Sequence, residues 1–405
     1  MSERDVAEDQ HAAAGGFSSR PPGACRTCQM PRKLRAGVFF DGTNNNKSRD
    51  QPTGNHTNVV RLYDVYPQAG GETLYRKYYI RGVGSQDQGE RARQLGQEIR
   101  PNSWNPLRIA GSVVAAPVRL GGYVADLGQD LAGKVGGAGG TARLNLAYTW
   151  LSARCGEVQP QGERTVDIFG FSRGAAIART FTNLVNQGLQ RQQPLIRVRF
   201  LGIFDTVGSF GIPGDDSDPG ENLGIDTLDA REIAHYTARH EYRQNFPLTR
   251  TSSSDTPYTG CHSDVGGSYP PVDSENRVNH LAAITFLDMY DALRRHEPAL
   301  AAVTAAMSCG LSRAQVAALK RRAAAEAPAE AQMAGQERRW TAAQRAFWER
   351  YIHQSHTSPS DWWIVNQAKR LNPNHLDNSG RRRLFPNPPR QELRGTPPNF
   401  SWRRP

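Results

Sequence analysis

The sequence predicts an α/β fold with a central, mostly parallel sheet flanked by helices. Segments rich in β-branched and aromatic residues alternate with segments of helical composition, which implies right-handed crossovers between parallel strands. The expected strands cover residues 34–40, 74–83, 166–169 and 196–204. Three of them are followed by short turns that contain Asp41, Ser172 and Asp205. Because ligands bind beyond the carboxyl ends of parallel strands, we expect these three residues to lie at one site.

The expected helices lie between and after these strands. They cover residues 59–66, 142–153, 175–189, 228–244 and 279–295, with a further Ala-, Arg- and Glu-rich helical region over residues 312–352. The chain is thereby divided into a disordered leader (residues 1–33), an α/β domain (34–300), a helical part that packs on this domain (301–370) and a basic extended tail (371–405). The leader is assigned as disordered because it is polar and has little to bury.

Residues 85–140 form an expected helical insertion in the α/β domain. Its first part is highly charged, and its later part is small and apolar, with dense glycine near residues 136–140. Two interpretations remain open. The insertion is either a mobile lid over a lipid-binding cleft or a poorly packed surface segment, since small residues alone do not demonstrate motion.

Composition and charge limit the possible classes of protein. The chain has 405 residues, a formal net charge of +11 and a mean hydropathy of −0.63. No stretch approaches the ~18 apolar residues of a membrane-spanning helix, and the polar first 24 residues lack the apolar core of a secretory signal peptide. Residues 381–405 hold seven Arg and one Glu. This tail is either a solvated segment or a binding surface for an anionic membrane or an acidic partner. Since no nucleic-acid recognition module accompanies the charge, we expect no nucleic-acid partner.

The five cysteines do not indicate a metal site or a disulfide scaffold. Cys25 and Cys28 have the spacing of a metal knuckle or a redox pair, but no second such pair and no suitably spaced histidine pair follow. The remaining three are scattered at positions 155, 261 and 309. We expect no metal and no cofactor, and the role of the Cys25/Cys28 pair stays open.

The most informative motif is Gly170-Phe171-Ser172-Arg173-Gly174. An apolar, strand-forming run leads into it and an alanine-rich, helix-forming run leads out. The chain must therefore turn sharply at Ser172, with the two glycines allowing the backbones to pass closely. Such a nucleophile elbow exposes a serine hydroxyl at the tip of the turn and predicts a serine hydrolase.

A serine nucleophile needs a base, and the base needs an acid that orients it. Asp205 follows Ser172 at the end of the next strand, and His262 follows later in a glycine-rich loop. This is the order nucleophile, acid, histidine that α/β-hydrolases use. His353 is a rival base and Asp264 a rival acid, although Asp264 stands so close to His262 that it more readily braces the loop.

The same chemistry needs two donors for the oxyanion that forms on the substrate. The first is expected from the main chain of Arg173, the residue after the nucleophile. The second is expected from the loop after the first strand, at Gly42 or Thr43. An alternative role for Asp41 and the asparagines that follow is to bind a hard cation through oxygen ligands.

Six sequence blocks, in this order, resemble one known family. They are Phe40-Asp41-Gly42-Thr43, Thr57-Asn58-Val59-Val60-Arg61-Leu62, Tyr79-Ile80-Arg81-Gly82-Val83-Gly84, Gly170-Phe171-Ser172-Arg173-Gly174-Ala175, Phe204-Asp205-Thr206-Val207 and His262-Ser263-Asp264-Val265-Gly266-Gly267. Over residues 34–290 they resemble the α/β-hydrolases that include type VI secretion phospholipase effectors of Gram-negative bacteria. The fourth and fifth blocks are the most specific.

The resemblance implies hydrolysis of phospholipid acyl esters by a triad of Ser172, Asp205 and His262. It also implies an antibacterial toxin, made in the cytoplasm and injected into the periplasm of a target cell. Its expected partners are a phospholipid membrane, a spike component of the secretion machine and a cognate immunity protein. The alternatives are an esterase or thioesterase on soluble substrates, and a non-catalytic basic binder of membranes or nucleic acid.

Overall fold

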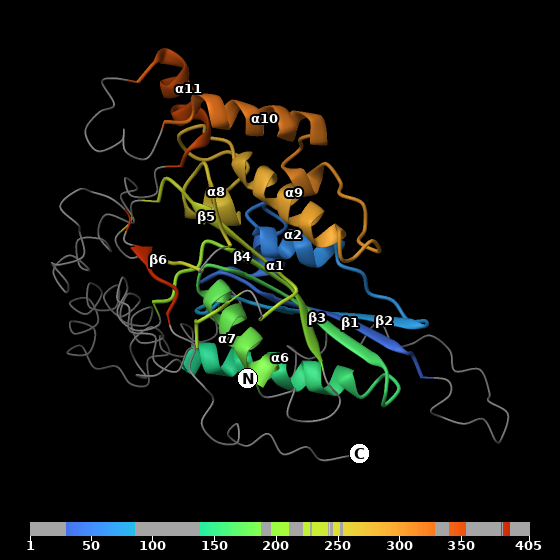
Figure 1. Ribbon diagram of the computed structural model, residues 1–405. Coiled ribbons are helices and arrows are strands. Elements are labelled where there is room, and N and C mark those ends of the chain that lie inside the picture. Colours follow the sequence, from blue (N-terminus) through green and yellow to red (C-terminus); the bar gives the residue numbers. More distant parts are fainter. Residues whose placement is uncertain are drawn as a thin grey trace, which may run out of the picture.

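A central parallel sheet organises the computed structural model of the chain (Figure 1). The structure describes residues 30–85, 138–187, 196–209, 222–226, 229–241, 243, 246–251, 254–328, 340–353, 382 and 384–388. Within these residues six strands pair in the order β2-β1-β3-β4-β5-β7, and every pair is parallel. The strands are β1 (Lys33–Phe40), β2 (Thr73–Ile80), β3 (Glu163–Phe171), β4 (Arg197–Phe204), β5 (Glu232–Ala238) and β7 (Asp255–Tyr258).

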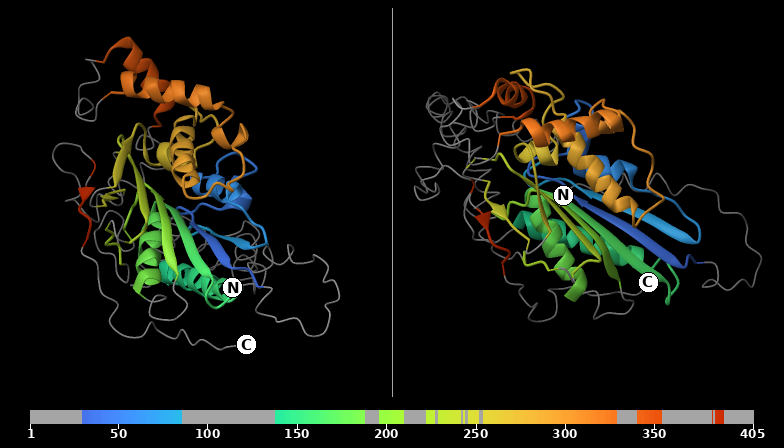
Figure 2. Two further views of the ribbon diagram at one scale, coloured as in Figure 1. Left: turned by 45° about the vertical axis from the view of Figure 1, so that its right-hand side comes forward. Right: turned by 45° about the horizontal axis from the view of Figure 1, so that its top comes forward.

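Helices cover both faces of this sheet, as the views in Figures 1 and 2 show. One face is covered by α6 (Ala138–Cys155) and α7 (Arg173–Gln187). The other face carries α2 (Asn58–Val65), α8 (His262–Gly266) and α9 (Leu281–Arg294), with α10 (Arg313–Glu326) and α11 (Ala342–Tyr351) outside them. Two short elements, α1 (Lys47–Asp50) and the 3-10 helix η4 (Ala306–Ser308), lie in the connections.

The hydrophobic core has two layers because both faces of the sheet are buried. Along the central strands, Phe39 and Phe169 pack toward α2 and α9, whereas Val38 and Ile168 pack toward α6 and α7. Successive strand residues point to opposite faces, so each central strand contributes to both layers. This explains why these strands have nearly continuous apolar sequences, which is typical of parallel sheets.

The expected α/β class and the four expected strands are confirmed, but the helix expected over residues 228–244 is wrong. This segment contains the strand β5, which pairs with β4 on one side and β7 on the other. Its sequence, Glu-Ile-Ala-His-Tyr-Thr-Ala, is rich in β-branched and aromatic residues and is buried toward its end. The segment forms a strand because its buried position between two other strands outweighs its weak local helix propensity.

A segment near the C-terminus pairs with the domain in a short two-stranded sheet. The strand β8 (Leu384–Phe385) pairs in parallel with β6 (Leu248–Thr249). The main-chain N–H of Arg250 extends this pairing with a bond to the carbonyl of Phe385 at 2.9 Å. The described residues of the expected basic tail are therefore docked on the α/β domain, and Arg382 is buried.

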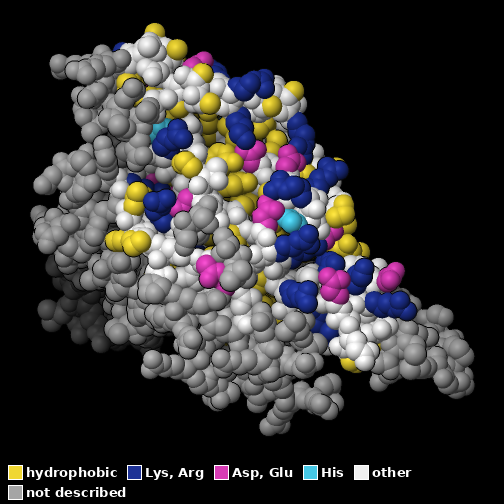
Figure 3. Space-filling model, viewed as in Figure 1, with side chains coloured by type: hydrophobic (Ala, Val, Ile, Leu, Met, Phe, Trp, Pro, Cys, Tyr) yellow, Lys and Arg dark blue, Asp and Glu magenta, His cyan; other side chains and the backbone are white. Residues whose placement is uncertain are grey.

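The exposed face in Figure 3 carries both signs of charge, with lysines and arginines interspersed among acids. Ion pairs at the surface include those of Arg313 with Asp291 and of Lys320 with Asp288. No helix among the residues that the structure describes is long and apolar enough to cross a membrane.

A buried ion cluster joins β3, β4 and the end of α9. Arg199 donates to Asp167 Oδ1 at 2.9 Å and to Glu297 Oε2 at 2.9 Å. Both carboxylates are almost completely excluded from water, and Arg199 forms an ion pair with each of them. Tyr66 donates a further hydrogen bond to Asp167 at 2.8 Å.

We expect Arg199→Met to lower the free energy of unfolding by about 3–5 kcal/mol, because two buried carboxylates lose their cation. Denaturant unfolding monitored by circular dichroism measures this change. Arg313→Met is the matched control, since its ion pair is about half exposed and should contribute less than about 1 kcal/mol. Equal losses for the two variants would show that the buried cluster does not carry the stability assigned to it.

Candidate active site

Ser172 lies at the turn between β3 and α7, where the backbone is strained. Its φ angle is 59°, in the left-handed region that residues other than glycine rarely adopt. A Cβ at Gly174 would lie 2.3 Å from the carbonyl oxygen of Asp41, and one at Gly170 would lie 2.5 Å from that of Gly174. Only glycine therefore fits at these two positions, which explains the spacing of the motif. Ser172 sits at the start of α7, where the helix dipole favours negative charge.

Asp205 follows β4 and reaches the same edge of the sheet. Its φ angle of 43° is also positive, and its side chain has no exposure to water. One carboxylate oxygen accepts from the main-chain N–H of Ala238 at 2.7 Å, and the other accepts from His262 Nδ1 at 2.5 Å. The guanidinium of Arg382 donates to both oxygens, at 2.7 and 2.8 Å.

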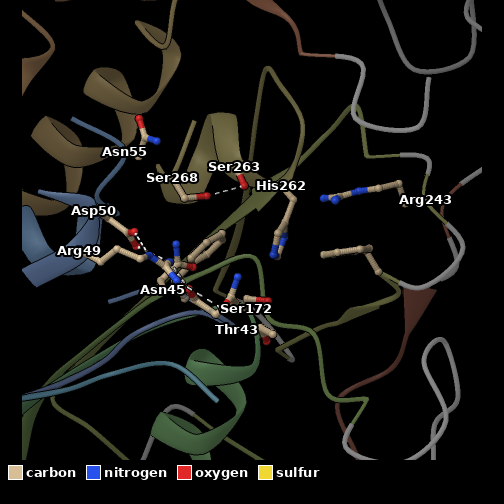
Figure 4. A pocket seen from close by; sticks show the side chains of 13 residues that line it. Thr43, Asn45, Arg49, Asp50, Asn55, Ser172, Arg243, His262, Ser263 and Ser268 are labelled. Carbon is tan, nitrogen blue, oxygen red and sulfur yellow. Dashed lines mark hydrogen bonds and ion pairs between the residues drawn. The ribbon is translucent and has the colours of Figure 1, made fainter. Parts of the chain in front are cut away.

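His262 is the first residue of α8, and aromatic rings hold its imidazole. The ring centroids of Phe171 and Phe246 lie 4.5 and 4.9 Å from that of His262. Its main-chain N–H donates to the carboxylate of Glu241 at 3.2 Å. Figure 4 shows the imidazole directed toward Ser172 in the pocket. The structure thus brings together the three residues that the chain order selects.

Burial and neighbouring charges shift the pKa values of Asp205 and His262. Burial raises the pKa of Asp205, but the charge of Arg382 and the hydrogen bond and charge of His262 outweigh burial and hold the pKa below its usual range. Burial lowers the pKa of His262, against the hydrogen bond and charge of Asp205. The carboxylate is therefore ionised and the imidazole neutral near pH 7. With its proton on Nδ1, the imidazole leaves Nε2 as a proton acceptor.

The loop after β1 is held by a buried carboxyl group. Asp41 accepts from the main-chain N–H of Gly42 at 2.8 Å, from Thr57 Oγ1 at 2.7 Å and from the Tyr79 hydroxyl at 2.5 Å. Burial raises the pKa of Asp41 to about 6. Both carboxylate oxygens of Asp41 accept hydrogen bonds from protein donors, and one of these donors is the main-chain N–H of Gly42. Thr43, the residue after Gly42, is held by the side chain of Arg173, whose Nε donates to Thr43 Oγ1 at 2.5 Å.

A pocket of ≈ 450 Å³ opens above Ser172 and His262. Its other lining residues are Thr43, Asn44, Asn45, Arg49, Asp50, Asn55, Phe171, Arg243, Phe246, Ser263 and Ser268 (Figure 4). The two arginines of this pocket are each paired with a carboxylate, Arg49 with Asp50 and Arg243 with Glu241. The cavity is thus largely polar, with aromatic walls beside the imidazole.

The rival base and acid form a separate pair. His353 Nδ1 lies 2.6 Å from Asp264 Oδ1, and the other oxygen of Asp264 accepts from the main-chain N–H groups of Cys261 and His353 at 2.9 and 3.2 Å. The His353 ring also stacks on Tyr269 with a centroid distance of 4.0 Å. This pair fastens the segment after α11 to the start of α8. Neither residue lines the pocket that contains Ser172.

Sequence reasoning missed Arg382, Glu241 and Arg243 as residues of this site. Arg382 and Glu241 are not marked by any local pattern, because they contact Asp205 and the main chain of His262 across the fold, and Arg243 joins the site through its ion pair with Glu241. Most of the expected insertion over residues 85–140, and the pair Cys25 and Cys28, lie outside the described residues.

Comparison with known proteins gives a family and a fold. The family described as "T6SS, Phospholipase effector Tle1-like, catalytic domain" matches residues 35–193 and 186–292. Among solved structures, one titled "Structure of the Tle1 effector bound to the VgrG spike from the Type 6 secretion system" is similar, with a TM-score of 0.51 and 16% identity over 88% of this chain and 94% of that one. An uncharacterized protein from Pseudomonas aeruginosa aligns with a TM-score of 0.46 and 19% identity over 87% of this chain and 61% of that one. No curated protein matches the chain significantly.

The family match defines the class of protein, a hydrolase. The chain belongs to the Tle1-like family of type VI secretion phospholipase effectors, and the match covers the catalytic domain of that family. This confirms the resemblance drawn from the six sequence blocks.

Asp41 gives a pH-dependent expectation for stability. Its folded-state pKa of about 6 lies above the ordinary value of 3.8, so its contribution is fully present below pH 3.8 and is lost as the pH rises through about 6. A shift of about two pH units corresponds to about 3 kcal/mol. We expect Asp41→Asn, which cannot ionise, to lack this component. Its free energy of unfolding relative to wild type should therefore rise between pH 4 and pH 8, as measured by urea unfolding; a constant difference would contradict the assignment.

Proposed function

We propose that the protein is a serine hydrolase that cleaves acyl esters of membrane glycerophospholipids, a phospholipase A-type reaction. Ser172 is the nucleophile, His262 the general base and acid, and Asp205 the residue that orients the imidazole. The observation that carries the proposal is one pocket that contains both a serine on a strained elbow and an imidazole whose Nδ1 is bound to a buried carboxylate. This is the arrangement that activates a weak nucleophile at neutral pH.

The reaction follows the acyl-transfer sequence of such triads. Ser172 Oγ attacks the ester carbonyl while His262 Nε2 takes its proton, and Asp205 stabilises the imidazolium. Collapse of the tetrahedral intermediate breaks the ester bond, and the lysophospholipid alcohol leaves with the proton from His262. Water then attacks the acyl-enzyme, again with His262 as base. The fatty acid departs and Ser172 is regenerated.

Two main-chain N–H groups stabilise the oxyanion in this proposal. One is that of Arg173, the first residue of α7, where the dipole of the helix adds to its effect. For the other, the loop after β1 offers Gly42 and Thr43. We favour Thr43, because the N–H of Gly42 already donates to Asp41 and Thr43 is held in place by the Arg173 side chain.

The biological setting is proposed from the family and the similar structure. We infer that the protein is an antibacterial toxin delivered by type VI secretion into the periplasm of a target cell. A spike protein comparable to the VgrG of the similar complex would carry it, and an immunity protein would protect the producer. The reaction needs neither a metal nor a cofactor. We retain residues 34–300 as the catalytic domain and 301–370 as a helical part packed on it.

The nucleophile is tested by Ser172→Ala, which we expect to lower kcat about 10⁴-fold or more. Fatty acid release from purified phospholipids measures this loss. Ser263→Ala is the control from the same pocket and should stay within about tenfold of wild type. A fluorophosphonate probe should label wild type but not the Ser172 variant. Near-wild-type release by Ser172→Ala would refute the proposal.

The substrate class is tested by comparing phospholipid vesicles with dispersed short-chain esters. We expect vesicles to be hydrolysed faster, with a lysophospholipid and a fatty acid as products, because remote parts of the correct substrate contribute to transition-state binding. Mass spectrometry of the products also reports which acyl ester is cut. Efficient cleavage of soluble esters together with intact vesicles would favour the esterase alternative.

A further inference from the structure

The C-terminal segment supplies a buried arginine to the proposed triad. Arg382 is 6% exposed and follows Asp205 by 177 residues. Its guanidinium forms a two-pronged interaction with the carboxylate, with Nη1 2.7 Å from Oδ1 and Nη2 2.8 Å from Oδ2. This fork is planar and fixes the plane of the carboxylate as well as its position.

Contacts on both sides of Arg382 hold it in place. Its Nε donates to the carbonyl of Phe246 at 2.7 Å, in the segment whose ring packs on His262. Beyond it, β8 pairs with β6, and Asn387 binds the main chain of Ile225 through its Oδ1 at 3.2 Å and its Nδ2 at 2.6 Å. Arg179 of α7 also donates to Asn387 at 2.7 Å. The segment is thus fastened to the helix that begins at the nucleophile.

The charge of Arg382 bears directly on the imidazole. Asp205 holds His262 Nδ1 on one side and Arg382 on the other, so the carboxylate charge is shared between them. The remaining charged groups around the ring come from the segment after β5 and from α8. They are Glu241, Arg243 and Asp264. Glu241 is already paired with Arg243, and Asp264 with His353, so Arg382 is the cation paired with Asp205.

We propose that Arg382 is a positioning residue of the active site, and that the C-terminal segment completes the triad by orienting Asp205 and balancing its charge. The inference rests on the proposed function of Ser172, Asp205 and His262. Without Arg382, the unbalanced carboxylate would favour the imidazolium form of His262. The base would then be neutral only at higher pH, and the carboxylate would be free to rotate.

The test compares Arg382→Gln and Arg382→Lys in the full chain, with hydrolysis of a soluble short-chain ester measured from pH 5 to pH 10. We expect Arg382→Gln to lower kcat/KM about 10- to 100-fold through misplacement of the base. The acid limb of its pH profile should move up by about one pH unit. Arg382→Lys keeps the charge without the fork. Its acid limb should stay in place while its rate falls by about tenfold.

Arg313→Gln is the matched control, because Arg313 makes the same two-pronged contact with Asp291 but is about half exposed. It should leave rate and pH profile unchanged. Two results for Arg382→Gln would overturn the inference. The first is a wild-type rate with a wild-type acid limb of the pH profile. The second is a lower melting temperature with no movement of that acid limb. If Arg382→Gln does not fold, a wild-type rate in Arg382→Lys overturns it. Ser172→Ala, assayed in parallel, tests the proposed serine hydrolase function separately. If Ser172→Ala is inactive while the Arg382 variants keep wild-type activity, the proposed function stands and only the role of Arg382 is overturned.

Discussion

A single buried carboxylate, Asp205, connects parts of the chain that are remote in sequence. It has no contact with water, so its charge is tolerated only because protein donors surround it. The end of β5 and the start of α8 each supply one of these donors, and Arg382 of the C-terminal segment supplies two. The positions of these elements are therefore tied to a common point. The carboxylate that Ala238 and Arg382 contact is the one that binds the imidazole of His262 directly.

The same edge of the sheet imposes a second constraint, that of close backbone approach. The turn at Ser172 passes so near the end of β1 that a Cβ at Gly174 would meet the carbonyls of Phe40 and Asp41. The turn at Ser172 and the loop after β1 are thus close to each other through their main chains. Asp41 accepts a hydrogen bond from the main chain of Gly42 in that loop, and the Arg173 side chain donates one to Thr43. Parallel strands make this possible because their carboxyl ends meet at one edge.

What the sequence predicts well is encoded locally. Periodicity and composition identify β1, β3 and β4, and the glycine spacing identifies the elbow at Ser172. Chain order then selects Asp205 and His262, which the structure brings together. The strand β5 was mistaken for a helix because its burial between two neighbours is a tertiary property. The role of Arg382 was equally hidden, since composition shows only a basic tail and the decisive contact spans 177 residues.

The position of Arg382 in the sequence also bears on the order in which the protein matures. A ribosome makes the strands of the central sheet long before it reaches residue 382, and domains tend to fold as they emerge. During that interval Asp205 lacks the guanidinium that balances it. All six strands of the central sheet precede β8 in the sequence, and pairing of β8 with β6 closes a loop of more than 100 residues, which carries a larger entropic cost than a local contact. The nascent chain can therefore form the sheet that carries Ser172 and Asp205 before residue 382 is available to pair with Asp205.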